Sequence, residues 1–119
     1  MHEFTGRHIL GELYGVSFEK VNNLDIMENL LRRGAEAANA TICGTIVKKF
    51  KPQGLSILIL LSESHVSVHT YPEKESIFFD IFTCGIKCKP YKFVEVIENE
   101  LKPSEKNIKV VERGNKNAT

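Results

Sequence analysis

The most apolar run of the chain covers residues 55–61 and is interrupted only by Ser56. Such a run is typical of a strand that is buried on both faces. Directly after it the pattern changes, because Val66 and Val68 alternate with polar residues over positions 65–71. This alternation predicts a second strand with one apolar face and one polar face. The polar face would carry His65, Ser67, His69 and Tyr71.

Further helices and strands are indicated on either side of this pair. Apolar residues at helical spacing predict helices over residues 24–39 and 90–101. The first helix is expected to begin near Asn22, with Asp25 three residues further on. The tail over residues 114–119 is expected to be mobile. Additional strands are predicted over residues 7–16, 41–50, 77–83 and 108–111.

The order of these elements predicts an α+β fold in a single domain, residues 1–119. Helices would cover one face of a largely antiparallel sheet, giving a two-layer protomer. Two helices cannot cover both faces, although the strand over residues 55–61 is apolar on both. We therefore expect a homodimer that forms a helix-sheet-sheet-helix sandwich. The alternative is a monomer with a modestly exposed apolar face.

Composition excludes several classes of protein. A net charge of +1 gives no basic surface for nucleic acid. No run of 18 apolar residues predicts a membrane span, and the N-terminus lacks a signal pattern, so a cytoplasmic location is expected. Three cysteines argue against a disulfide framework. The spacing of Cys84 and Cys88 is not that of a zinc site, so no metal is expected.

The polar strand also carries candidate chemistry. Ser64 places a hydroxyl beside the Glu63–Ser64 peptide bond, and His65 and His69 follow on the same strand. A hydroxyl, a peptide bond and a neighbouring imidazole are the parts of a nucleophile-and-base site. The alternative is that these are ordinary polar residues of an exposed strand face.

The residue order over positions 62–73, Ser-Glu-Ser-His-x-Ser-x-His-Thr-Tyr-Pro-Glu, resembles that of the prokaryotic-type S-adenosylmethionine decarboxylase proenzymes, in the pyruvoyl-dependent decarboxylase superfamily. The resemblance extends over roughly residues 6–101. Its other matching segments are Gly6-Arg7-His8, Phe50-x-Pro52-x-Gly54-x-Ser56 and Asp80-x-Phe82-Thr83-Cys84-Gly85.

The resemblance implies a chain that cleaves itself. The Ser64 hydroxyl would attack the Glu63 carbonyl and convert the amide into an ester, and β-elimination would then break the ester. The products would be residues 1–63 and residues 64–119, the second beginning with a pyruvoyl group derived from Ser64. This group would form a Schiff base with the substrate and accept the electrons of decarboxylation, without pyridoxal phosphate. The product, decarboxylated S-adenosylmethionine, would serve polyamine (spermidine) synthesis.

The resemblance also assigns the other processing roles. Glu63 would become a new C-terminus. His69 would assist processing at the elimination step, and Ser56 would hydrogen-bond the intermediate. His65 lies inside the motif, but no step is assigned to it.

Three further residues would act on the substrate. Cys84 would return a proton to the substrate carbon, Glu73 would hold the ribose hydroxyls, and Phe50 would stack on the adenine. Each has a structural alternative: Cys84 as buried filler, Glu73 as a solvated turn residue and Phe50 as part of the core.

The substrate remains open at this point. Ile57 and residues 74–76 depart from the family pattern near the expected substrate position. The alternative is a pyruvoyl-dependent arginine or ornithine decarboxylase, in which Glu75 or Glu12 would hold the distal cation. A more remote alternative is an inactive dimeric binding domain.

Overall fold

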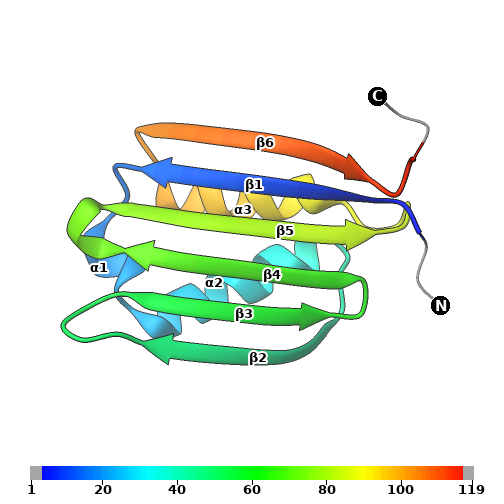
Figure 1. Ribbon diagram of the computed structural model, residues 1–119. Coiled ribbons are helices and arrows are strands. Elements are labelled where there is room, and N and C mark those ends of the chain that lie inside the picture. Colours follow the sequence, from blue (N-terminus) through cyan, green and yellow to red (C-terminus); the bar gives the residue numbers. More distant parts are fainter. Residues whose placement is uncertain (1–3, 117–119) are drawn as a thin grey trace.

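The computed structural model describes residues 4–116 and places them in one antiparallel sheet with helices on one face (Figure 1). The elements are β1 (Gly6–Tyr14), α1 (Phe18–Val21), α2 (Leu24–Ala37), β2 (Ile42–Lys49), β3 (Leu55–Leu61), β4 (Ser64–Tyr71), the 3₁₀ turn η1 (Pro72–Lys74), β5 (Ser76–Cys84), α3 (Pro90–Leu101) and β6 (Glu105–Arg113). The predicted two-layer α+β protomer is confirmed.

The six strands lie in the order β2-β3-β4-β5-β1-β6. Hairpins join β2 to β3, β3 to β4 and β4 to β5, so this half of the sheet follows the chain. Strand β1 pairs with β5 on one side and with β6 on the other. Residues near the start of the chain therefore lie beside residues far along it.

The core lies between the sheet and the two longer helices. On β4, Val66 and Val68 are fully buried on this side, as their alternation predicts. Helices α2 and α3 contact each other closely because Gly34 has no side chain, and a Cβ at this position would lie 2.7 Å from the Phe93 ring. Phe93 itself is fully buried. Burial of a side chain of this size stabilises the fold by about 1.5–3 kcal/mol.

The second face of the sheet is open in the protomer. Strand β3 was expected to be buried on both faces, but only its helix-side residues are covered, and Leu58 and Leu60 are 46% and 61% exposed. This is the uncovered apolar face that two helices in one protomer were expected to leave. The homodimer remains a prediction. Other exposed apolar residues that the strand register places on this open face include Leu10, Ile46, Phe78 and Val111.

Several boundaries differ from the sequence prediction. Helix α2 begins after Asn23, whose side chain accepts a hydrogen bond from the Ile26 amide, so Asn22 is not its N-cap. Helix α1 was missed because four residues are too few to show a helical period. Strand β6 is longer than residues 108–111 but is an edge strand as expected. Of the expected mobile tail, residues 117–119 lie outside the described residues. Within residues 4–116, no helix is long and apolar enough to cross a membrane.

Candidate active site

The predicted site residues fall into two groups at opposite ends of β4 (Figure 1). Glu63, Ser64 and Cys84 lie where the β3–β4 hairpin meets the end of β5. His69 is five residues from Ser64 along the strand, which at about 3.3 Å per residue separates them by roughly 16 Å. The residues at the other end are Phe50, Ser56, His69 and Glu73.

The carbonyl oxygen of Glu63 is held by the backbone. It accepts a hydrogen bond from the Cys84 amide, with an N–O distance of 3.1 Å. The Glu63 carboxylate accepts a second hydrogen bond, 3.0 Å long, from the Thr41 amide. A backbone N–H aimed at a carbonyl oxygen stabilises the negative charge that forms there when a nucleophile adds. The Glu63–Ser64 bond is therefore both fixed in position and polarised.

Ser64 has an unusual backbone conformation, with a φ of +154°. Residues other than glycine rarely occupy this region, and holding one there costs of the order of 1–3 kcal/mol. Pairing of Ser64 with Leu61 on one side and Thr83 on the other keeps it in place. Strain is thus concentrated at the bond that the sequence marks for cleavage.

The Ser64 hydroxyl lies beside an imidazole. Its Oγ is 3.3 Å from Nδ1 of His65. The other nitrogen of this ring, Nε2, is 2.8 Å from Oδ2 of Asp80 on the neighbouring strand. A nucleophile, a base and a carboxylate therefore follow one another across β4 and β5.

Asp80 is the centre of a larger hydrogen-bonded cluster. The same Oδ2 atom lies 2.6 Å from Nε2 of His8 on β1, and Ser67 donates to Oδ1. Burial raises the pKa of Asp80, but the hydrogen bonds from Ser67, His8 and His65 outweigh it and hold the pKa below its ordinary value. The carboxylate is therefore ionised at neutral pH.

Sequence reasoning left His65 without a role because its partners are distant in the chain. Asp80 is 15 residues away and His8 is on a different strand altogether. The alternation places His65 on the polar face, but it contains no information about which strands lie next to β4. The segments Gly6-Arg7-His8 and residues 80–85 were the available signal, since both matched the family. Strand β5, which holds Asp80, lies next to β4, and β1, which holds His8, is the next strand after it.

Ligands for a metal are found together at one place among residues 4–116. Nitrogen and oxygen atoms of His8, His65 and Asp80 lie within 4.8 Å of one another. In the structure, both rings instead direct Nε2 at the carboxylate, at hydrogen-bond distances. The expectation that the protein uses no metal remains a prediction.

Cys84 ends β5 beside the cleavage point and is partly exposed. Strand β1 approaches it closely because Gly6 has no side chain, and a Cβ there would lie 3.1 Å from the Cys84 Sγ. Cys88 differs, since it is buried and its pKa is raised by burial and by the nearby Glu63 and Cys84. Of the two thiols, Cys84 is the accessible one.

The far end of β4 holds the second group. Ser56 and His69 are direct partners in the β3–β4 ladder, and Ser56 Oγ lies 2.8 Å from His69 Nδ1. Phe50 follows β2 and is 49% exposed, so it is not part of the core. Glu73 lies exposed in η1. These side chains are available to another molecule.

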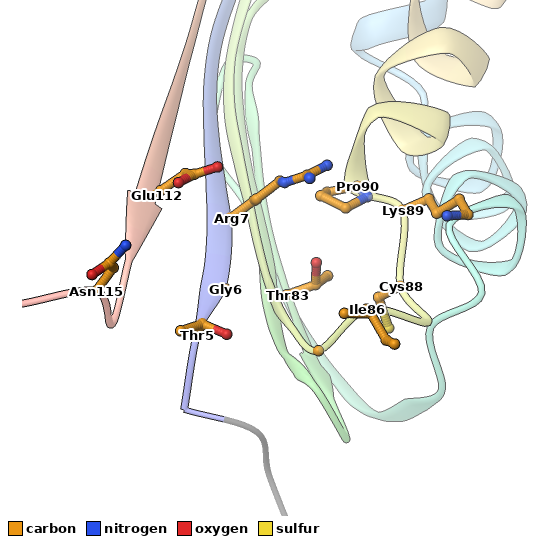
Figure 2. Close-up of a pocket in the computed structure, with 11 residues that line it drawn as sticks. Thr5, Gly6, Arg7, Thr83, Ile86, Cys88, Lys89, Pro90, Glu112 and Asn115 are labelled. Carbon is orange, nitrogen blue, oxygen red and sulfur yellow. The ribbon is translucent and has the colours of Figure 1, made fainter. Parts of the chain in front are cut away.

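A pocket of about 270 Å³ lies at the Cys84 end, between the sheet and the start of α3 (Figure 2). Figure 2 shows Arg7, Thr83 and Pro90 around it. None of the seven predicted site residues lines this pocket, and sequence reasoning did not find it. The His65–Asp80 cluster is on the opposite face of the sheet, because Arg7 and Thr83 alternate with His8 and Phe82 along their strands.

Comparison with known proteins agrees with this arrangement. The sequence model of the family described as S-adenosylmethionine decarboxylase matches residues 7–114. An S-adenosylmethionine decarboxylase proenzyme from Sulfurihydrogenibium sp. is 40% identical over 114 residues, covering 96% of this chain and 86% of that protein. Another, from Archaeoglobus fulgidus, is 37% identical over 110 residues, covering 92% of this chain and 98% of that protein. The crystal structure of the adenosylmethionine decarboxylase from Aquifex aeolicus superposes with a TM-score of 0.88 at 33% identity, covering 98% of both chains. The resemblance noted in the sequence is confirmed, and the chain belongs to the S-adenosylmethionine decarboxylase family.

Proposed function

We propose that this chain is a self-processing, pyruvoyl-dependent decarboxylase of S-adenosylmethionine that supplies decarboxylated S-adenosylmethionine for spermidine synthesis. Its membership of the family supports this function, as do relatives named proenzymes. The observation that carries the proposal is the geometry at one peptide bond. The Glu63 carbonyl accepts a hydrogen bond from the Cys84 amide. The adjacent Ser64 has a strained backbone φ angle, and its hydroxyl lies beside the His65 imidazole.

Processing would begin with attack of Ser64 Oγ on the Glu63 carbonyl carbon. The resulting oxyanion would lie where the Cys84 N–H already points, so its charge would be stabilised as it forms. Breaking the C–N bond gives an ester with a free amine on Ser64. Removal of the Ser64 α-proton, with His69 as the base and Ser56 as its hydrogen-bond partner, then expels the Glu63 carboxylate. Hydrolysis of the resulting dehydroalanine by water releases its nitrogen as ammonia and leaves the pyruvoyl group.

A pyruvoyl group at this position supplies a ketone that accepts the electrons released by decarboxylation. Cys84, partly exposed beside it, would deliver a proton to the substrate carbon. Phe50 offers an exposed aromatic face for the adenine, and Glu73 offers a carboxylate that accepts hydrogen bonds from the ribose hydroxyls.

A homodimer would bring the two ends of β4 together. Within one chain His69 lies roughly 16 Å from Ser64, too far to reach the Ser64 α-proton. If the open faces of two protomers pack about a two-fold axis perpendicular to the strands, the partner's His69 lies over Ser64 of the first chain. By the same symmetry, His69 of the first chain lies over the partner's Ser64. The exposed Leu58 and Leu60 support the same packing, since sheet-on-sheet contact ~10 Å thick would bury them.

Two measurements test the function. On a denaturing gel the purified protein should appear as residues 1–63 and residues 64–119, while Ser64→Ala should remain a single band. Carbon dioxide should be released from carboxyl-labelled S-adenosylmethionine and not from arginine or ornithine. An unbroken wild-type chain would refute the self-processing. Saturable decarboxylation of arginine or ornithine alone would replace the substrate and keep the mechanism.

A further inference from the structure

We propose that His65 is the base that takes the proton of the Ser64 hydroxyl and returns it to the departing Ser64 nitrogen, with Asp80 as the residue that positions the ring. This inference rests on the proposed self-processing and assigns the step that starts it. His69 would then act only in the later elimination.

The hydrogen bonds determine which nitrogen of His65 is free to accept a proton. The Asp80 carboxylate is ionised and can only accept hydrogen bonds. His65 Nε2, 2.8 Å from Asp80 Oδ2, must therefore carry the ring proton. In the neutral ring Nδ1 then keeps its lone pair, and Ser64 Oγ lies 3.3 Å from it. This distance is within the range over which catalytic hydrogen bonds tighten when the reaction begins.

The remaining contacts of Asp80 keep it in this orientation. His8 Nδ1 lies 3.3 Å from the Arg113 guanidinium, which can only donate, so His8 also carries its proton on Nε2 and donates to Asp80. Ser67 donates to the other carboxylate oxygen. Three donors from β1 and β4 thus fix a carboxylate on β5, and that carboxylate fixes the ring beside the nucleophile.

Within one chain, no other histidine among residues 4–116 is placed for this step. His69 lies at the far end of β4, and its Nδ1 contacts Ser56. His8 has one nitrogen directed at Asp80 and the other at Arg113. In the single protomer the side chain of His65 is 42% exposed, so it does not belong to the core between the sheet and the helices.

The step balances within one imidazole. The proton moves from Ser64 Oγ to His65 Nδ1 as the new C–O bond forms at Glu63, and the carbonyl electron pair moves onto the oxygen beside the Cys84 amide. When that pair returns, the C–N bond breaks and the same proton passes from Nδ1 to the Ser64 nitrogen. No external acid, base or cofactor is consumed.

Hydroxylamine distinguishes the two histidines, because at neutral pH it cleaves esters and leaves amides intact. The uncleaved His65→Ala and His69→Ala proteins are purified and treated with hydroxylamine, and the masses of the fragments are measured by mass spectrometry. We expect His69→Ala, which can form the ester, to be cut at Glu63–Ser64. We expect His65→Ala to stay whole, because its bond is still an amide. Cleavage of His65→Ala at this bond would overturn the assignment.

His65→Asn separates basicity from hydrogen bonding and guards against a folding defect in the alanine variant. The asparagine side-chain oxygen occupies nearly the place of Nδ1 and accepts a hydrogen bond, but it does not take up a proton. We expect its processing rate to fall ~10²–10⁴-fold, the usual contribution of a general base. Processing at the wild-type rate would mean that His65 only positions the serine. Wild type and Ser64→Ala are run alongside, so failure of self-processing itself is seen separately, as an uncleaved wild type.

Discussion

The two ends of β4 differ in how complete they are within one chain. At the Ser64 end a nucleophile, an imidazole, a carboxylate and an amide donor are all in contact, drawn from β4, β5 and the connecting hairpin. At the His69 end a single hydrogen bond joins two side chains, and Phe50 and Glu73 are exposed. The Ser64 end therefore has the groups needed to rearrange the Glu63–Ser64 bond, whereas the His69 end has exposed side chains that another molecule can contact. We infer that the first step of processing uses one chain and that the later chemistry needs two.

A mixture of two inactive chains tests most directly whether the two ends of β4 act in different chains. His69→Ala and Ser64→Ala should each remain uncleaved alone. Co-expressed with different tags, they should form mixed dimers in which the His69→Ala chain, facing an intact His69, is cleaved. The measurement is the tag-specific appearance of residues 64–119 on a denaturing gel.

The matched mixture replaces His69→Ala by His65→Ala. It should stay uncleaved, because we assign His65 to its own chain. If mixed dimers form but the His69→Ala chain stays whole, His69 does not act across the interface and the contrast between the two ends fails.

The next largest effect is expected at Cys84, which belongs to the Ser64 end but should matter only after processing. Cys84→Ala keeps the backbone amide that contacts the Glu63 oxygen, so cleavage should proceed. Without the thiol, kcat should fall ~10²–10⁴-fold, as for loss of a general acid. Cys88→Ala is the control and should retain kcat. Equal kcat values for the two variants would remove Cys84 from the reaction.

Substitutions at the far end should change substrate binding instead. Phe50→Ala should raise KM about tenfold, since stacking of a base on an aromatic ring contributes ~1–3 kcal/mol. Glu73→Gln should also raise KM, because the carboxylate that would accept hydrogen bonds from the ribose hydroxyls is lost. Processing should be unaffected. Phe18→Ala, a comparably exposed phenylalanine on α1, is the control. A changed cleavage rate in the Phe50 or Glu73 variants, with KM unaltered, would mean that these residues act in processing and not in substrate binding.

The smallest effect concerns stability at the Ser64 end. The folded state lowers the pKa of Asp80, so its ionised form stabilises the fold above the ordinary aspartate pKa, and this contribution is lost as the pH falls through the folded value. In the uncleaved Ser64→Ala background, Asp80→Asn should reduce the unfolding free energy by about 1–3 kcal/mol at neutral pH. Denaturant titrations should show the difference shrinking as the pH falls through the lowered pKa of Asp80. A constant difference would mean that the Asp80 charge is not stabilised by its partners.

Local sequence patterns predicted most of the helices and strands, but they did not predict which strands lie next to one another in the sheet. Alternation around Val66 and Val68 correctly predicted which face of β4 is buried, since period-two geometry is a property of the strand alone. The pairing of β1 with both β5 and β6 is non-local and leaves no periodic trace. The position of Ser64 at the start of a strand follows from the local sequence and was predictable. The contact between His65 and Asp80 depends on the pairing of β4 with β5 and was not. The apolar pattern of β3 predicted that the helices of one chain would leave one apolar face uncovered, and Leu58 and Leu60 lie on that face.

The strand order has a consequence for the cleaved protein. Cutting after Glu63 leaves β1, β2 and β3 on one piece and β4, β5 and β6 on the other. Because β1 is inserted between β5 and β6, the two pieces would be interlaced and joined by backbone hydrogen bonds at every border that they share. Unfolding of the intact chain is unimolecular, whereas unfolding of the cleaved form also lets the two pieces diffuse apart. Its recovery is then a second-order encounter that slows on dilution. Self-cleavage at this bond would therefore make recovery of even a single protomer depend on concentration.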